Sequence, residues 1–213
     1  MSSSIIQTTT ARFLLIIAVF AVIVAAGYLT RAQDPQPEPY HLVKLDNNGE
    51  PMPLWAGPWF CVKDTKNRLI WEAKNNNENL HHGSWSYSWF DGETGVPDKG
   101  NCNHEDDYLC DVADLLEKTR SEQLCGIRNW RLPTAAELKT LVREQNIGYG
   151  ASINQAFFPY TRQSNYWIAD KGQKLTGFYQ RFGEGAKVIN FKDGEENTLP
   201  YSNASFVRLV SDY

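Results

Sequence analysis

The pattern of apolar and polar positions begins with an uncharged apolar run at residues 13–29, FLLIIAVFAVIVAAGYL, which Arg12 and Arg31 bracket. Its length is at the short end of what a membrane-spanning helix requires. We therefore predict a tail at residues 1–12 and a transmembrane signal-anchor at residues 13–30. A cleaved signal peptide is the alternative, because small residues follow the most apolar part and can form a processing site. In both interpretations, this segment directs the rest of the chain out of the cytoplasm.

A proline-rich spacer follows at residues 31–40, where Pro35, Pro37 and Pro39 favour an extended, semi-rigid backbone. Beyond it, aromatic and apolar residues are spread along the whole chain without a repeat of fixed period. The sequence therefore predicts one globular domain at residues 41–213.

Alternation of period two marks the strands of this domain. Leu69, Trp71 and Ala73 alternate with Ile70 and Glu72, which predicts a half-buried strand. Further short strands are predicted at residues 59–62, 166–169, 177–182, 187–191 and 206–210.

Two segments carry the helical period instead. Asp111 can cap a first helix whose apolar positions are Val112, Leu115 and Leu116. A capping box opens a second helix at residues 134–137, and its apolar stripe is Leu138, Leu141 and Val142. The order of strands, two helices and strands predicts an α+β fold with antiparallel sheet and long loops.

Composition narrows the possible partners. The chain carries a net charge of −4 with 22% charged residues, so it lacks the basic excess of a nucleic-acid binder. It is rich in aromatic residues, with 7 Trp, 10 Tyr and 10 Phe, which supply rigid packing and stacking surfaces. We therefore do not expect the protein to bind nucleic acid.

Four cysteines, Cys61, Cys102, Cys110 and Cys125, follow the export segment and predict two disulfides in an oxidising compartment. Three pairings are possible. We favour Cys102–Cys110 as a local clip before the first helix, and Cys61–Cys125 as a link between a strand and the segment after that helix. The residues alone leave the other pairings open.

The segment HHGSWSYSWF at residues 81–90 places Trp85, Tyr87 and Trp89 at every second position, so all three share one face if the segment is extended. That face can stack on sugars or on a peptide. A buried sheet face is the alternative and the commoner use of such a pattern. Together with Trp167, these residues are our ligand-binding candidates.

The sequence gives less support for a metal site than for a ligand-binding surface. The acidic run at residues 105–107, with Asp111 and Asp114 nearby, offers the oxygen ligands that calcium prefers. We favour a solvated acidic patch, because carboxylates at the start of a helix complement its dipole. The cysteine spacing also matches neither a zinc finger nor a zinc ribbon. We predict no metal and no cofactor.

Sequence motifs of catalysis are also missing. The chain contains no GxSxG motif, P-loop or HExxH motif. It also shows no nucleophile placed beside an activating base. We therefore predict a protein that is not an enzyme.

The segment LCGIRNWRLPTAAEL at residues 124–138 closely resembles the signature of the C-terminal domain family of Legionella collagen-like proteins. Flanking blocks resemble that family in the same order, and the resemblance covers residues 55–211. The structural signature residues in these blocks are Trp71, Trp130, Arg131, Pro133, Glu137 and Arg208. We interpret Trp130 and Arg131 as residues that lock the core, because aromatic area and a five-donor guanidinium suit that role.

The resemblance implies a C-type-lectin-like fold, related to the formylglycine-generating enzymes, in bacterial surface or periplasmic proteins. It also implies adhesion or ligand binding, with glycosaminoglycan or host-matrix binding in some members. The reactive cysteines of the formylglycine-generating group have no counterpart after Cys125. The chain departs from the family pattern at Lys66-Asn67, at residues 168–169 and at Ser211, and the loss of polar groups at the last two places weakens the expectation of glycan binding. Asn67 can still adopt the positive φ of the expected turn.

These observations lead to two functional hypotheses. The first is a non-enzymatic, adhesin-like binding module for a glycan or protein ligand. It is tethered in the inner membrane with its domain in the periplasm, or is secreted or displayed at the cell surface. The second is a structural subunit of an envelope complex, whose transmembrane helix packs on partner subunits through small residues such as Ala18, Ala21 and Gly27.

Overall fold

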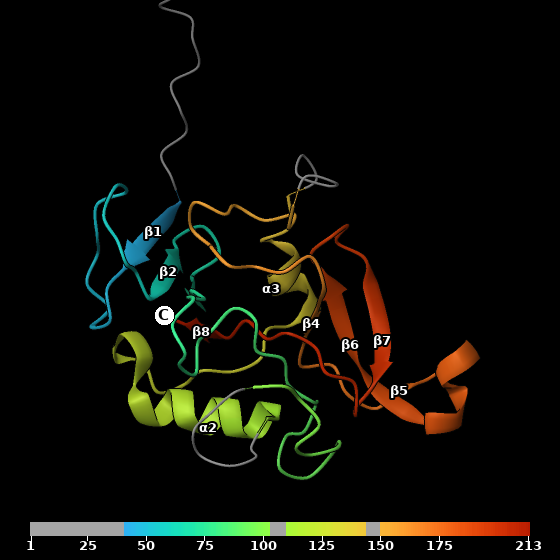
Figure 1. The fold of residues 1–213 in the computed structure, drawn as a ribbon. Helices are drawn as coiled ribbons and strands as arrows, with labels where there is room; N and C mark the ends of the chain where they lie inside the picture. The colour runs from blue at the N-terminus through green and yellow to red at the C-terminus, as the bar shows by residue number, and fades with distance from the viewer. Residues whose placement is uncertain (1–40, 103–109, 144–149) are drawn as a thin grey trace, which may run out of the picture. The chain divides into compact units, whose positions relative to one another are not determined.

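The first sheet is antiparallel and carries the strand order β1-β2-β3-β8 in a computed structural model, which describes residues 41–102, 110–143 and 150–213. Its strands are β1 (Leu42–Leu45), β2 (Cys61–Asp64), β3 (Leu69–Glu72) and β8 (Val210–Asp212). The chain therefore brings its last described strand back to pair with β3 (Figure 1). The tight turn between β2 and β3 has its positive φ at Arg68 and not at Asn67, and the side-chain amide of Asn67 donates to Asp64 at 2.7 Å.

The second sheet surrounds β6 (Glu184–Asn190), which pairs antiparallel with β4 (Asn165–Trp167), β5 (Gln173–Lys174) and β7 (Glu196–Pro200). The prediction of strands in this region was right for β4 and β6, and it missed the polar strands β5 and β7. Figure 1 shows this sheet on the opposite side of the domain from β1 and β2.

Two strand predictions were wrong in detail. Residues 177–182 form the 3₁₀ helix η3 (Gly177–Phe182), whose side chains are not buried, so their aromatic character does not reflect a sheet face. Gly177 and Gly183 bracket it with φ of 58° and 77°, values that favour glycine. The strand predicted at residues 206–210 instead begins at Val210, while Phe206 makes one isolated parallel bridge with Tyr166.

Both predicted helices are confirmed. Helix α2 (Val112–Glu122) begins at Asp111, whose carboxylate accepts the backbone N–H of Asp114 at 3.1 Å. Helix α3 (Ala135–Lys139) begins with a capping box at Thr134 and Glu137. It ends earlier than the apolar stripe suggested, and Leu141 and Val142 pack on the core from the turn that follows.

The core consists of two clusters. One gathers Trp71, Leu138, Phe158, Tyr166 and Ile189 among others, so it joins the two sheets through α3. The second gathers Trp130, Trp167, Tyr87, Trp89 and Leu115 among others, and it lies where α2 meets the second sheet. Figure 1 shows α3 between the two sheets and α2 alongside them.

The two disulfides join Cys61 to Cys125 and Cys102 to Cys110, which confirms the favoured pairing. The first ties β2 to the 3₁₀ helix η1 (Leu124–Gly126), and the second closes the loop before α2. Each such bridge stabilises a domain by roughly 2–4 kcal/mol.

The predictions for the start of the chain lie outside the described residues. This applies to the tail at residues 1–12, the transmembrane segment at residues 13–30 and the spacer at residues 31–40. Within the described parts of the chain, no helix has both the length and the apolar character needed to cross a membrane.

Candidate functional site

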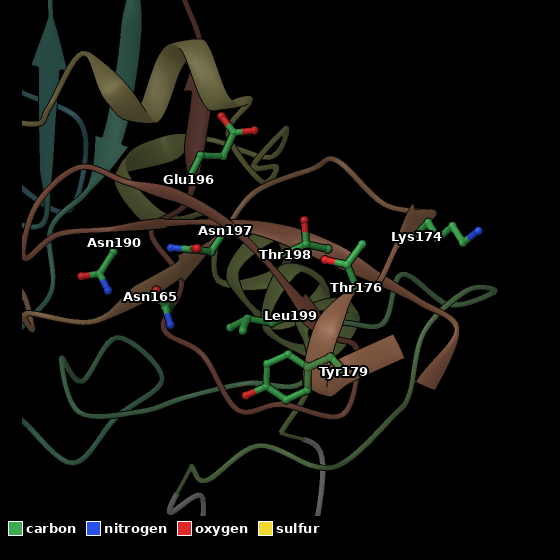
Figure 2. Close-up of a pocket in the computed structure, with 9 residues that line it drawn as sticks. All are labelled: Asn165, Lys174, Thr176, Tyr179, Asn190, Glu196, Asn197, Thr198 and Leu199. Atoms are coloured by element: carbon green, nitrogen blue, oxygen red, sulfur yellow. The ribbon is translucent and has the colours of Figure 1, made fainter. Parts of the chain in front are cut away.

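An open, mostly polar pocket lies on the second sheet beside β7 (Figure 2). Its volume is about 450 Å³. We call it the β7 pocket, and its lining residues are Asn165, Lys174, Thr176, Tyr179, Asn190, Glu196, Asn197, Thr198 and Leu199. Amides, hydroxyls and one aromatic ring together can form hydrogen bonds to a ligand and also stack on it.

Three asparagines form one side of the β7 pocket because strand pairing aligns them. Asn165 on β4 lies directly opposite Asn190 on β6, and Asn197 on β7 lies opposite Val188, two residues before Asn190. Side chains two residues apart share a face of a sheet, so all three amides project from the same face. Figure 2 shows the three side chains gathered at one end of the pocket.

Asn165 adds a specific chemical feature to this end. Its Oδ1 atom is buried, and none of the described residues donates a hydrogen bond to it. A buried acceptor without a partner costs about 1–3 kcal/mol. A ligand hydroxyl or N–H that reached Asn165 Oδ1 would therefore recover that free energy.

Tyr179, from η3, forms the wall opposite the asparagines, and its hydroxyl points towards the end where Asn165 lies (Figure 2). It belongs to an exposed aromatic tip, in which its ring centroid lies 5.4 Å from that of Phe178 and 6.3 Å from that of Phe182. The guanidinium of Arg181 lies over both of these phenylalanine rings, at 5.3 Å and 4.8 Å. Phe178 is 78% exposed and Phe182 is 48% exposed.

Glu196 sits at the edge of the pocket as a paired carboxylate. Lys139 contacts its Oε2 at 2.8 Å, and Lys187 contacts its Oε1 at 2.7 Å. The hydrogen bonds from Lys139 and then Lys187 lower the pKa of Glu196. Since two lysines contact one carboxylate, Glu196 is held in its charged form.

The aromatic residues predicted to bind a ligand lie elsewhere. Tyr87, Trp89 and Trp167 are 1%, 2% and 0% exposed, and none of them lines the β7 pocket. The indole N–H of Trp167 donates to the carbonyl of Tyr87 at 2.7 Å, and that of Trp89 donates to the carbonyl of Ile168 at 3.0 Å. These three rings are core residues and offer no face on which a ligand could stack, as the buried-face alternative anticipated.

Trp85 remains partly exposed. Its indole N–H donates to the carbonyl of Asn79 at 2.8 Å, and its ring lies 4.5 Å from that of His82. The surrounding segment makes isolated bridges, such as Tyr87 with Ser205, and does not form a continuous strand. Trp85 packs, partly buried, against the core cluster that contains the other three candidates.

The signature residues around α3 form a clamp between that helix and β8. Arg131 exchanges backbone hydrogen bonds with Val210, and its guanidinium contacts both carboxylate oxygens of Glu137 at 2.9 and 2.8 Å. It also contacts Asp212 at 2.9 Å. The hydrogen bonds from Arg131 are the main cause that lowers the pKa of Glu137 to about 2. Trp130 is fully buried beside this clamp, so the interpretation of both residues as structural fits their contacts.

A comparison with sequence models of protein families identifies the family of this chain. The sequence model of the Lcl C-terminal domain matches residues 60–211, which is more than half of the chain. The chain belongs to the Lcl C-terminal domain family. This is the collagen-like protein family that the signature at residues 124–138 resembles. Comparison with curated proteins and with solved structures gives no match.

The remaining signature residues of this Lcl C-terminal domain are buried. Trp71 and Arg208 are 0% exposed, and Pro133 accepts a backbone hydrogen bond from Ala169 at 2.9 Å. Arg208 donates to the carbonyl of Glu72 at 2.6 Å and to the hydroxyl of Thr161 at 2.7 Å. Burial lowers the pKa of Arg208, and charge interactions with Tyr166 and Glu72 partly offset this effect.

An ionic network lies inside the Lcl C-terminal domain and was not predicted from the sequence. Glu72 Oε1 contacts Lys74 Nζ at 2.6 Å and His81 Nδ1 at 2.7 Å. His81 Nε2 reaches Glu122 on α2 at 3.1 Å. Of these, only Glu122 is substantially exposed, at 52% of its side chain. The network links β3 to α2, and its acid and base groups lie away from the residues that line the β7 pocket.

The predicted solvated acidic patch is present only in part, because Asp111 is buried, with 2% of its surface exposed. Asp98, Asp111 and Asp114 bring carboxylate oxygens within 4.8 Å of one another, while residues 105–107 lie outside the described residues. Burial, followed by the negative charge of Asp111, raises the pKa of Asp114 to about 6. The Asp111 carboxylate also caps α2, which agrees with the preference for acidic groups at a helix start.

Sequence reasoning missed the residues of the β7 pocket. Asparagine is rare in strands, so Asn165 and Asn197 appear in the linear sequence as residues of loops. A usable signal was that Asn165 directly precedes the strand predicted at residues 166–169, and that Asn190 lies within the strand predicted at residues 187–191. Their meeting depends on pairing between distant strands, which no local pattern reveals.

Proposed function

We propose that the Lcl C-terminal domain of this chain is a non-enzymatic binding module of the bacterial envelope, and that its ligand occupies the β7 pocket. The observation that carries this proposal is the unpartnered, buried Oδ1 of Asn165 within a cluster of three amides. Such a site favours a ligand rich in hydroxyl or amide groups. Glycans and polypeptides both offer these groups.

The clustered amides also argue for binding over catalysis. Tyr179, Lys174 and the threonines of the pocket have no activating base within the pocket apart from Glu196, and Glu196 is already engaged by two lysines. Catalysis by these groups would need a free base or an activated nucleophile. A binding role requires neither.

The proposal includes a tether and a fold relationship. Residues 13–30 anchor the domain in the inner membrane and place it in the periplasm, a role that the uncharged run at residues 13–29 supports. A C-type-lectin-like relationship is supported by the family membership and by the two-disulfide α+β architecture. Amino-terminal sequencing of the mature protein tests the tether, because cleavage would remove it.

Binding by the full chain in mild detergent tests the function. A glycan array and a peptide array are incubated with the native chain, with Asn165→Ala and with Asn197→Ala. We expect an array signal from the native chain that falls about tenfold or more in both variants, since each loses hydrogen-bonding groups of the pocket. Asn76→Ala is the matched control, because Asn76 is exposed and lies outside the pocket lining.

Two results would contradict the proposal. One is the absence of any signal on both arrays from a folded native chain. The other is a signal that Asn165→Ala and Asn197→Ala leave unchanged.

A further inference from the structure

An exposed apolar turn lies between β1 and β2. Its tip residues, Leu54 and Trp55, are 48% and 88% exposed. The structure describes all seven tryptophans of the chain, and Trp55 is the one that is exposed. The surrounding segment at residues 51–58, PMPLWAGP, contains no charged residue. Because tryptophan is usually well buried, a contiguous apolar surface with Trp55 at its tip marks a contact surface.

The fold holds this turn in a fixed position. Ala56 donates its N–H to the carbonyl of Pro53 at 3.0 Å, which closes a turn with Leu54 and Trp55 at its centre. The ammonium of Lys44 donates to the carbonyl of Leu54 at 2.9 Å and to that of Ala56 at 3.5 Å. Lys44 is only 7% exposed, so a buried lysine of β1 ties down the two carbonyls on either side of Trp55.

The turn lies at the end of β1 where the chain enters the domain. Pro51 makes an antiparallel bridge with Leu45, and Met52 donates its N–H to β1 at 2.8 Å. The chain beyond Pro51 therefore runs back beside β1 towards its first residue, Leu42 (Figure 1). The acidic loop at residues 46–50 lies at the other end of β1.

Charged groups at the entry end of the first sheet are compatible with a lipid surface. Lys66 and Arg68 are exposed on the turn between β2 and β3, which pairs with the start of β1. Asp64 in the same turn is 1% exposed, and Asp212 on β8 contacts Arg131 at 2.9 Å. The two exposed cations have long side chains that can reach lipid phosphates while the apolar turn contacts the acyl region.

The sequence before β1 limits how far this turn can lie from a membrane. The uncharged apolar run ends at residue 29, and the spacer at residues 31–40 leads directly to the domain. An extended polyproline conformation rises about 3.1 Å per residue, so ten such residues span about 31 Å. The entry end of β1, with the turn beside it, therefore stays close to the bilayer that holds the anchor.

The aromatic tip on η3 is a weaker candidate for the same contact. Phe178 is 78% exposed, but the guanidinium of Arg181 lies over its ring and over that of Phe182. In Figure 1, η3 lies with the second sheet, on the side of the domain away from β1. The spacer enters the domain at β1, so it brings the turn at Trp55 to the membrane more directly than it brings η3.

We propose that the turn formed by Leu54 and Trp55 docks in the interfacial layer of the lipid bilayer to which the chain is tethered. This inference rests on the tether that the proposed function includes, and it adds a second contact with the membrane. Tryptophan favours this layer because its large apolar ring contacts acyl chains while its N–H bonds to water or headgroups. Since the second sheet lies opposite β1, this contact leaves the β7 pocket open towards the periplasm (Figure 1).

The test uses the full chain, transferred from mild detergent into vesicles of phosphatidylethanolamine and phosphatidylglycerol, with and without bromine on the acyl chains. Bromine quenches tryptophan emission on contact, and residues 1–40 contain no tryptophan. The emission of the native chain minus that of Trp55→Phe is the emission of Trp55. We expect bromine to reduce this difference about twofold or more, because an interfacial indole contacts acyl chains.

Phe178 supplies a matched control. The double variant Trp55→Phe/Phe178→Trp moves the reporter to η3, and its added emission relative to Trp55→Phe should be the same in both kinds of vesicle. Both positions are exposed, so neither substitution opens a cavity in the core. Circular dichroism checks that each variant is folded.

The outcomes separate docking from the tether. Quenching at position 55 without quenching at position 178 supports the inference. Equal emission of Trp55 in both kinds of vesicle overturns docking, whereas flotation of the chain with the vesicles still supports the tether. Quenching at position 178 also overturns docking through this turn. So does a Trp55 emission that changes with the protein-to-lipid ratio but not with bromine, since a second copy would then cover the turn. A chain that does not float with the vesicles contradicts the tether and docking together, and leaves ligand binding in the β7 pocket unaffected.

Discussion

Glu72 and His81 form a buried ion pair, in which His81 Nδ1 lies 2.7 Å from Glu72 Oε1. Glu72 is 0% exposed and His81 is 6% exposed. Burial alone would raise the pKa of Glu72 and lower that of His81. The positive charge of Lys74 and the hydrogen bond from His81 reverse this for Glu72, whose pKa falls to about 2. Hydrogen bonds to Glu122 and Glu72 reverse it for His81, whose pKa rises above 6.5.

The ion pair predicts a stability maximum between two pH limits. A raised histidine pKa stabilises the fold below the ordinary value of 6.5, and that stability is lost as pH rises through the folded-state pKa. A lowered carboxyl pKa stabilises the fold above the ordinary value of 4.5, and that stability is lost as pH falls towards 2. Thermal unfolding followed by circular dichroism from about pH 3 to pH 9 should therefore show a decline at both ends.

A substitution of His81 tests whether this residue causes the loss of stability at alkaline pH. Replacement of His81 by Gln should lower Tm at about pH 6 and flatten the decline above about pH 7, since the titrating group is gone. His41→Gln serves as the comparison, because His41 is exposed and outside the ionic network. An unchanged alkaline slope in His81→Gln would show that another group causes the decline.

Arg131 clamps α3 to β8, and its planar guanidinium contacts both oxygens of Glu137. Lysine keeps the charge but cannot make this bidentate contact. We expect Arg131→Lys to reduce the free energy of unfolding by about 1–3 kcal/mol, measured by urea titration. Arg128→Lys is the control, because Arg128 is exposed in the same segment. Equal values for the two variants would show that charge alone matters at position 131.

Local signals in the sequence predicted those elements whose cause is also local. The cap at Asp111 and the capping box at Thr134 and Glu137 act within one helical turn, so both helix starts could be placed correctly. The ends of helices were harder to predict. Helix α3 stops at Lys139, although Leu141 continues the apolar pattern and packs on the core after the helix. Tertiary packing, and not helical periodicity, buries that residue.

The site was less accessible to sequence reasoning. Trp89 and Trp167 were attractive because aromatic rings stack on ligands, but rings also fill cores, and both are buried. In contrast, Phe178 and Phe182 suggested a buried strand and are exposed on η3. The asparagines of the β7 pocket act through pairing between β4, β6 and β7, which is a long-range property of the fold.

The two disulfides should contribute unequally. Cys61 and Cys125 are 64 residues apart, whereas Cys102 and Cys110 are 8 residues apart. In the chain-entropy account, a larger loop restricts the unfolded chain more, and the difference here is about 2 kcal/mol. We expect the double variant Cys61→Ala/Cys125→Ala to be less stable than Cys102→Ala/Cys110→Ala by roughly that amount in urea unfolding. The opposite order would indicate that the short loop has a special role in the native state.

The raised pKa of Asp114 predicts that this group destabilises the domain at neutral pH. Burial and the nearby charge of Asp111 raise its pKa to about 6, whereas its ordinary value is 3.8. Above the ordinary value the unfolded chain releases this proton more readily than the folded domain does, so stability falls as pH rises from about 4 through about 6. Asparagine has nearly the same shape and carries no charge. We therefore expect Asp114→Asn to raise Tm at about pH 7 and to leave it nearly unchanged at about pH 4.

The control for this prediction is Glu117→Gln, on the same helix but outside the carboxylate cluster. A gain of equal size at both pH values would show that helix propensity, and not the titration of Asp114, is responsible.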